Sequence, residues 1–265
     1  MTEYSKKFFA DIRDDYAFFE AHTTEFDRDL YHYQQAISQF SIPETPLKFL
    51  DFGCGTGVFT SRFLDGLNFP PQSLEITLIE PDEVYRQNAV SVLSNYTQFP
   101  IENFSCLPTE IPRPFHLILS NHVLYYVPDL SSTINQLLQA LHPQGILLMT
   151  MAGKANIISQ FWQKCFDWLG KKIPYYLAED LMAISQDLSL IYQRQTVTYE
   201  LRFPDTIENR WKLLRFMLGN HLEQLTEYNL PALFDPYSFQ SQIDITTSHY
   251  QFLFQSPELM ASEHL

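Results

Sequence analysis

The chain has 265 residues and a formal net charge of −14, from 31 acidic and 17 basic residues. No stretch concentrates Lys and Arg, and an acidic surface repels a phosphate backbone, so nucleic acid is excluded as an expected substrate. Apolar residues make up 45% of the chain, which excludes a disordered chain and suits one large domain with a cap or insertion. The acidity would suit a cationic small molecule, but it is also a common solubility feature.

Three cysteines lie far apart in the chain, at Cys54, Cys106 and Cys165. An odd number without a CxxC pair predicts no disulfide framework. The first residues lack the basic-then-apolar pattern of a signal peptide, and no apolar run reaches the length of a membrane span. We therefore expect a cytoplasmic protein that contacts no membrane and is a monomer or a homodimer.

Aromatic residues at helical spacing predict helices over residues 3–40, interrupted at 21–24, and the Pro-containing segment 41–46 predicts a connector. Short apolar strands then alternate with helices, which is typical of a parallel sheet covered on both faces. The expected strands span 48–52, 74–79, 101–106, 115–120 and 145–151, and the expected helices span 58–67, 82–94 and 130–141, with a turn at His142-Pro143-Gln144.

The pattern loosens after residue 154. We expect helices over 155–169 and 178–188, a strand over 192–203, a helix over 207–226 and a last strand over 250–254. The predicted fold is α/β: a Rossmann-like, doubly wound, seven-stranded and mostly parallel sheet with a helical N-terminal cap and an inserted lid. In one domain of residues 1–265, we expect the cap over 1–45, the core over 46–203 and 241–265, and the lid over 204–240.

The segment Asp51-Phe52-Gly53-Cys54-Gly55-Thr56-Gly57 follows a predicted strand and opens a helix. Glycines permit a tight turn and close approach of a ligand, and the helix N-terminus behind them favours an anionic group. Glu80 ends the next strand, where a carboxylate can accept hydrogen bonds from two ribose hydroxyls. Asp82 is more typical of a helix cap than of a ligand.

A dinucleotide is the competing ligand for this loop. Its fingerprint requires glycine at the sixth position of GxGxxG, where this chain has Val58. An acid at Asp51 is poorly placed beside a pyrophosphate, but well placed for the amino group of an amino-acid ligand.

The segment from Asp51 to Gly57 resembles motif I of the class I S-adenosylmethionine-dependent methyltransferases, whose pattern is acid-x-Gly-x-Gly-x-Gly. Residues 114–124 are similar to the fourth strand and following loop of that family, and residues 141–148 to its "helix, turn, Gly, fifth strand" signature. The motifs cover roughly residues 45–155. The plan of a helical cap and an insertion before the last strand also resembles the small-molecule group that contains histamine N-methyltransferase.

The resemblance implies S-adenosylmethionine as cofactor and S-adenosylhomocysteine as product. It places the methionine part of the cofactor on Asp51 and the loop 53–57, the ribose on Glu80 and the adjoining Pro81, and the adenine near Cys106 and Leu107. Asn121 would lie near the sulfonium and His122 near the acceptor. Many members have an acid just after the third strand or at the start of the fourth; this chain has Leu107 and His116 there, and Glu110 could supply an adenine contact instead.

The acceptor side has several candidates. Methyl transfer needs alignment of the acceptor with the methyl carbon, and an acceptor of high pKa also needs a base. His122 is the best base candidate, with a structural role equally open, followed by Tyr125 and His22, which are more typical of packing and surface roles. Trp211, Phe216 and Tyr126 are candidates for substrate contact, with core packing as the alternative. No His and carboxylate cluster at metal-ligand spacing is evident, so no metal is expected.

We therefore expect methyl transfer to a nitrogen or oxygen of a small molecule, with a slight preference for an amine. Two alternatives stay open. One is O-methylation of a phenol, enol or carboxylate in secondary metabolism, and the other is a non-catalytic protein that binds the cofactor in a regulatory role. A dinucleotide oxidoreductase is the least favoured.

Overall fold

The computed structural model describes residues 12–38, 46–108 and 114–255. Its sheet has the strand order β3-β2-β1-β4-β5-β8-β6, and the short β7 also pairs with β8. Strands β1 to β5 run parallel, and β8 runs antiparallel to both of its long neighbours. The strands are β1 (Leu47–Phe52), β2 (Leu74–Ile79), β3 (Glu102–Phe104), β4 (Phe115–Asn121), β5 (Leu141–Met151), β6 (Tyr192–Pro204), β7 (Ser238–Phe239) and β8 (Gln242–Gln255).

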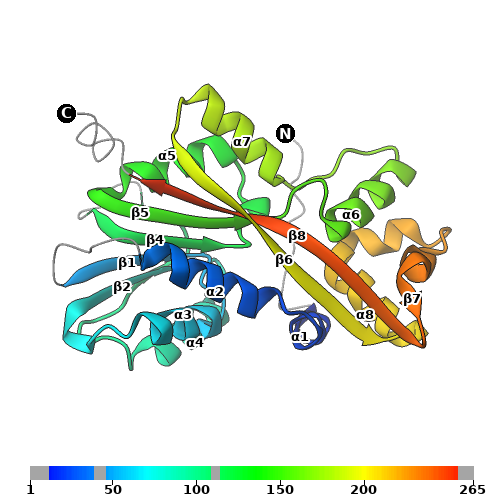
Figure 1. The fold of residues 1–265 in the computed structure, drawn as a ribbon, viewed down its shortest axis with the longest axis horizontal. Helices are drawn as coiled ribbons and strands as arrows, with labels where there is room; N and C mark the ends of the chain where they lie inside the picture. The colour runs from blue at the N-terminus through cyan, green and yellow to red at the C-terminus, as the bar shows by residue number, and fades with distance from the viewer. Residues whose placement is uncertain (1–11, 39–45, 109–113, 256–265) are drawn as a thin grey trace.

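Helices cover both faces of this sheet (Figure 1). They are α1 (Arg13–His22), α2 (Glu25–Ile37), α3 (Val58–Leu67), α4 (Glu83–Leu93), α5 (Leu130–Gln139), α6 (Ile157–Trp168), α7 (Ala178–Asp187) and α8 (Ile207–Leu218), with 3₁₀ segments η2 (Pro71–Ser73), η3 (Leu124–Tyr126), η4 (Gly219–Leu225) and η5 (Leu230–Tyr237). The mixed α/β Rossmann-like architecture predicted from the sequence is confirmed.

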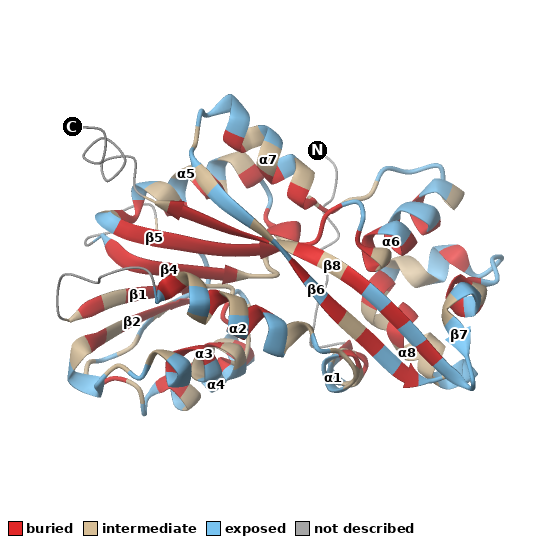
Figure 2. Ribbon diagram, viewed as in Figure 1, coloured by how far each residue is buried: buried red, intermediate tan, exposed pale blue. Residues whose placement is uncertain are grey.

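The core divides into two clusters, one on each face of the sheet. Phe49 and Leu117 belong to the cluster beneath α2, α3 and α4, whereas Leu50 and Ile118 belong to the cluster that includes α5, α6 and α8. Because successive side chains of a strand point to opposite faces, neighbouring residues of β1 and β4 contribute to different clusters. The central strands are buried along most of their length (Figure 2), as expected for parallel strands covered on both faces.

Strands β6 and β8 form a long two-stranded arm that extends beyond β5 (Figure 1). The predicted last strand was too short, because β8 begins at Gln242 rather than at residue 250. Its early half alternates buried and exposed residues (Figure 2), with Ile243, Ile245 and Thr247 buried. A half-buried strand needs only every second side chain to be apolar, so the polar residues between them hid it.

Two further boundaries differ from the sequence prediction. The predicted turn at 142–144 lies within β5, where the pairing of β5 with β4 shifts register between Phe115 and Leu117. The helix predicted over 207–226 ends at Leu218, because Gly219 takes a positive φ of 49° and the chain continues as η4. The sequence did not predict η5 or β7.

Among the described residues, no helix combines the length and apolarity that crossing a membrane requires.

Candidate functional site

The glycine loop between β1 and α3 has the backbone that its sequence requires. Gly53, Gly55 and Gly57 have φ values of 86°, 53° and 79°, in the left-handed region that favours glycine. A Cβ atom on Gly57 would lie 2.9 Å from the Cα of Ala89, so this glycine permits close packing of α4. A Cβ atom on Gly55 would meet nothing within 4 Å, so the loop leaves space for a ligand beside Gly55.

Asp51 lies at the end of β1, where its side chain is 3% exposed and accepts a hydrogen bond from the Thr60 hydroxyl of α3. Burial raises the pKa of Asp51 to about 7, although the Thr60 hydrogen bond acts in the opposite direction. A cation near this carboxylate would offset the cost of its buried negative charge.

Glu80, just after β2, reaches back to the glycine loop. Its carboxylate accepts hydrogen bonds from the Gly55 N–H at 3.1 Å and the Asp82 N–H at 2.9 Å. Burial raises the pKa of Glu80 above its ordinary range, against the effect of these two hydrogen bonds. Asp82 caps α4 by accepting a hydrogen bond from the Tyr85 N–H, so its predicted role as a helix cap is confirmed.

The residues predicted around the rest of the cofactor differ in exposure. Pro81 and Cys106 are exposed, whereas Thr56 and Leu107 are partly buried. All three cysteines are free, and Cys54 is buried within the glycine loop. His116, at the start of β4, is buried and accepts a hydrogen bond from the Lys48 N–H at 3.0 Å. Glu110 lies outside the described residues.

The turn after β4 joins the glycine loop to the acceptor side. His122 has a φ of 56°, an unusual conformation for a non-glycine residue. Val123 follows it and packs on the glycine loop, because a Cβ atom on Gly53 would lie 2.3 Å from a methyl group of Val123. The structure therefore brings Gly53 close to the turn that contains His122, which is 69 positions later in the sequence.

Next to this turn lies a group of buried and half-buried polar side chains that we call the polar cluster: Glu25, Asp29, Asn121, His122 and His249. Asp29 of α2 is fully buried and is the centre of the cluster. Its carboxylate accepts hydrogen bonds from His249 Nε2 at 2.6 Å, His122 Nε2 at 3.1 Å and Asn121 Nδ2 at 3.4 Å. The Glu25 carboxylate lies 3.7 Å from His122 Nε2 and 3.5 Å from His249 Nδ1.

Charge is strongly coupled within the polar cluster. Burial alone would lower the pKa of His249, but the carboxylates of Asp29 and Glu25 raise it to about 10. Burial alone would raise the pKa of Asp29, but His249 and His122 hold it well below its usual range. The pKa of Glu25 is lowered for the same reason, with His122 as the largest favourable influence. The two carboxylates therefore face a protonated His249 in a buried group close to the glycine loop.

Both ring nitrogens of His122 already have partners. Nε2 contacts Asp29, and Nδ1 lies 3.0 Å from the Tyr125 hydroxyl. That hydroxyl also accepts a hydrogen bond from the Ala152 N–H at 2.6 Å. Because Nε2 donates to the Asp29 carboxylate, a neutral ring leaves Nδ1 to accept the proton of the Tyr125 hydroxyl. An acceptor molecule would have to displace one of these partners before His122 could take its proton. Burial raises the pKa of Tyr125 well above its ordinary value, which keeps this phenol in its neutral, donating form.

The remaining predicted residues lie around the cluster or in the core. Tyr126 packs edge-on against Tyr125, with 5.6 Å between ring centroids. His22, at the end of α1, has its Nδ1 2.8 Å from the Phe18 carbonyl oxygen. Phe216 stacks on Phe19 with 4.6 Å between centroids and so helps to join α8 to α1, and Trp211 is partly buried against the same core.

Sequence reasoning missed Glu25, Asp29 and His249. The two acids lie four positions apart on α2, on the face that also carries the buried Leu30 and Tyr33. Charged residues on the buried face of a helix are a signal that could have been noticed. His249 could have been found only by extending the last strand toward the N-terminus, so that residues 243, 245, 247 and 249 share one buried face.

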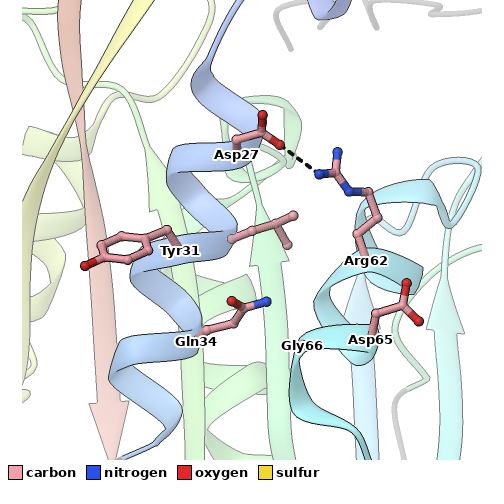
Figure 3. A pocket seen from close by; sticks show the side chains of 7 residues that line it. Asp27, Tyr31, Gln34, Arg62, Asp65 and Gly66 are labelled. Atoms are coloured by element: carbon pink, nitrogen blue, oxygen red, sulfur yellow. Dashed lines mark hydrogen bonds and ion pairs between the residues drawn. The ribbon is translucent and has the colours of Figure 1, made fainter.

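A hollow of about 440 Å³ lies on the surface between α2 and α3, away from the glycine loop (Figure 3). It is crossed by the ion pair of Asp27 with Arg62, which is 2.9 Å long. Leu30, Tyr31, Gln34, Asp65 and Gly66 complete its lining. These side chains are mostly exposed. The candidate site lies instead at the carboxyl ends of β1, β2 and β4, which is where parallel sheets bind ligands.

Comparison with known proteins agrees with this geometry. A family model described as "Methyltransferase domain" matches residues 24–188. A malonyl-[acyl-carrier protein] O-methyltransferase of Acetivibrio thermocellus is 30% identical over 111 residues, which cover 40% of this chain and 36% of that relative. The protein of the same name from Bacteroides thetaiotaomicron is 25% identical over 203 residues, 74% of this chain and 68% of the relative. The chain thus aligns with about a third of one curated relative and two thirds of the other.

Among solved structures, N-methyltransferase NodS from Bradyrhizobium japonicum WM9, in complex with S-adenosyl-L-homocysteine, has the same fold with a TM-score of 0.51 and 16% identity. The alignment covers 88% of this chain and 89% of that one.

Proposed function

Because this chain belongs to the methyltransferase domain family, we propose that it transfers a methyl group from S-adenosylmethionine to a nitrogen or oxygen of a small molecule. The observation that carries the proposal is the contact between Glu80 and the Gly55 N–H beside the open space at that glycine. It supports the proposal because a carboxylate, a glycine loop and a helix N-terminus, the groups suited to ribose and to an anionic group, lie around one space with the polar cluster next to it.

We assign the methionine part of the cofactor to Asp51 and the glycine loop, from Gly53 to Gly57. The amino group of the cofactor is a cation, which would offset the negative charge of the buried Asp51. Glu80 would accept hydrogen bonds from the ribose hydroxyls, with Pro81 beside it. Cys106 and Leu107 are assigned to the adenine, and Asn121 to the neighbourhood of the sulfonium.

When bound, the cofactor supplies an electrophilic methyl group on a positively charged sulfur. The protein has to hold the acceptor in line with that group and to exclude water. We assign the acceptor to the space next to the polar cluster, with α2 on one side and the turn after β4 on the other. Two carboxylates in the cluster, Glu25 and Asp29, favour a cationic acceptor, so an amine is the preferred substrate class.

His122 is assigned to the acceptor as the base that removes its proton. Asp29 would hold the ring and stabilise the imidazolium that forms, as a carboxylate does for a catalytic histidine. Because Asp29 keeps Nε2, the acceptor would displace the Tyr125 hydroxyl from Nδ1, and Tyr125 positions the ring before the acceptor binds. The insertion over 204–240 reaches the cluster indirectly, because Trp162 lies 6.0 Å from Tyr125 and donates a hydrogen bond to the Met217 carbonyl oxygen of α8.

O-methylation of a carboxylate is a second candidate, supported by the curated relatives that are O-methyltransferases of a malonyl group on acyl-carrier protein. The acidity of this chain opposes it, because a formal net charge of −14 repels an anionic acceptor.

The test is an acceptor screen that measures S-adenosylhomocysteine formation, after calorimetric titration with S-adenosylmethionine, S-adenosylhomocysteine and NAD. Binding of the two adenosyl ligands and turnover with small amines would support the proposal. Cofactor binding without turnover on amines or carboxylates would favour a regulatory protein. Binding of NAD alone would refute the proposed methyltransferase function. His122→Ala should reduce kcat far more than it weakens cofactor binding, whereas His142→Ala, on β5 near His116, should change neither.

A further inference from the structure

Three side chains of the polar cluster form a group with the composition of a metal site. Glu25 comes from the start of α2, His122 from the turn after β4, and His249 from β8. One carboxylate oxygen and one ring nitrogen from each histidine all lie within 4.8 Å of one another. Atoms bonded to one ion at about 2.1 Å lie about 3.0 to 3.5 Å apart, so adjustments of about 1 Å or less would bring these three atoms around an ion.

His249 gives the strongest indication. Its side chain is 0% exposed, and its Nδ1 lies 3.5 Å from the Glu25 carboxylate, too far for a well-formed hydrogen bond. A cation between this nitrogen and that carboxylate would satisfy both groups. The other nitrogen, Nε2, donates to Asp29 at 2.6 Å, which leaves the lone pair on Nδ1 when the ring is neutral. Metal-bound histidines typically donate their second N–H to a carboxylate in this way.

His122 is arranged in a complementary manner. Because the Tyr125 hydroxyl donates to Nδ1, the second nitrogen, Nε2, faces Asp29 and Glu25. In the metal-free protein Nε2 donates its proton to Asp29. A metal ion would replace that proton on Nε2. The hydrogen bond between Nδ1 and the Tyr125 hydroxyl would be kept as long as the ring does not rotate. The carboxylates that hold a proton on His249 also attract a dication, so metal and protons compete for this cluster.

We propose that Glu25, His122 and His249 bind a divalent transition-metal cation, with Asp29 holding His249 in the ligating orientation. Two imidazole nitrogens and one carboxylate oxygen favour the zinc, iron or cobalt class over calcium or magnesium, which prefer oxygen ligands. Three protein ligands leave at least one coordination position for another molecule. This further role rests on the proposed function: a nitrogen or oxygen of the acceptor would take that position, the metal would lower its pKa, and His122 would then serve as a ligand in place of its role as the base.

The structural alternative is that the same charges only anchor α2 to the sheet. The two readings differ in metal affinity, so we would treat the full-length protein with chelator, dialyse it and titrate it with Zn²⁺ by calorimetry. We expect one ion per chain. Co²⁺ in place of Zn²⁺ should give the visible absorption of a protein-bound ion with nitrogen ligands, and this signal reports the site directly.

Matched variants locate the ion. Glu25→Gln removes a ligand at a side chain that is only partly buried, so the fold should persist, and Zn²⁺ affinity should fall by more than about tenfold. Asp29→Asn should weaken binding by about 10- to 100-fold, the range for a residue that orients a ligand. His142→Asn alters a histidine outside the cluster and should leave the affinity unchanged. The circular dichroism of each variant would be compared with that of the wild type.

Failure to bind Zn²⁺ would overturn the proposal, as would equal affinities of the wild type and a folded Glu25→Gln variant. A parallel titration with S-adenosylmethionine separates this result from the proposed function. Cofactor binding without metal binding would refute the metal site alone. Metal binding without cofactor binding would support the metal site and refute the methyltransferase assignment.

Discussion

Asp51→Asn provides a quantitative test of how the cofactor side is built. Burial raises the pKa of Asp51 to about 7 from an ordinary value of 3.8. Between pH 4 and pH 7 the folded protein therefore retains a proton at Asp51 that the unfolded chain has released. The free energy of unfolding must then fall as pH rises through this window. At about 1.4 kcal/mol for each pH unit, the charged carboxylate costs about 4 kcal/mol above pH 7.

The amide that replaces the carboxylate in this variant would keep the size of the side chain and an oxygen for the Thr60 hydroxyl, but it carries no charge. Urea unfolding of both proteins, followed by circular dichroism from pH 4.5 to 8, gives the difference in unfolding free energy. Because the other groups titrate in both proteins, the difference isolates Asp51. We expect the variant to gain stability over the wild type as pH rises, by up to about 4 kcal/mol at pH 8.

The same substitution should weaken binding of S-adenosylmethionine, because the variant has no charge to meet the amino group of the ligand. In the wild type, cofactor affinity should rise with pH until the pKa near 7 is passed. Asp187→Asn, at an exposed position at the end of α7, is the control and should show neither effect. A stability difference that does not vary with pH would refute the reasoning about burial, and unchanged cofactor affinity would refute the assignment of Asp51 to the ligand.

Three further changes test other parts of the molecule. Gly55→Val should abolish cofactor binding, as measured by calorimetry, because its side chain would occupy the open space beside the loop. Glu80→Ala should weaken cofactor binding by at most about 3 kcal/mol, the loss of a charge-assisted pair of hydrogen bonds, and unchanged affinity in both variants would move the site elsewhere. Arg210→Ala should lower the unfolding free energy by about 1 to 3 kcal/mol. Arg210 pairs with Asp205 at 2.6 Å and with Asp235 at 2.5 Å, and so ties together the two ends of the insertion. A melting temperature equal to that of the wild type would contradict this.

The cofactor side was predictable because its determinants are local in sequence. Asp51, the glycines and the helix behind them are consecutive, and each glycine is explained by the turn that it has to make. Glu80 follows one strand later, and parallel neighbours bring their carboxyl ends to the same edge. The contact of Glu80 with Gly55 therefore follows from the order of the elements alone.

The polar cluster could not be predicted in the same way. Its central contact joins Asp29 to His249, and these residues are 220 positions apart. The sequence gives no reason to bring α2 against the last strand. The predicted strand over 250–254 also began one residue too late to include His249, so its imidazole was not recognised as part of any buried face.

The arm of β6 and β8 explains how the cluster is assembled. On β8, Ile243, Ile245 and Thr247 are buried on one face, and the period of two places His249 on the same face. A slip of one residue in the pairing with β6 would turn His249 away from Asp29. Strand β6 positions the start of α2. The Thr24 N–H donates a hydrogen bond to the Glu200 carbonyl oxygen of β6, and the Glu200 N–H donates one to the Thr24 hydroxyl, both at 2.9 Å.

These two hydrogen bonds fix the first turn of α2, where Glu25 follows Thr24 directly. One strand of the arm thus sets the position of His249 and the other that of Glu25, while the end of β4 supplies His122. The long arm, the feature least evident in the sequence, is therefore what brings two of the three proposed metal ligands to the acceptor side of the glycine loop.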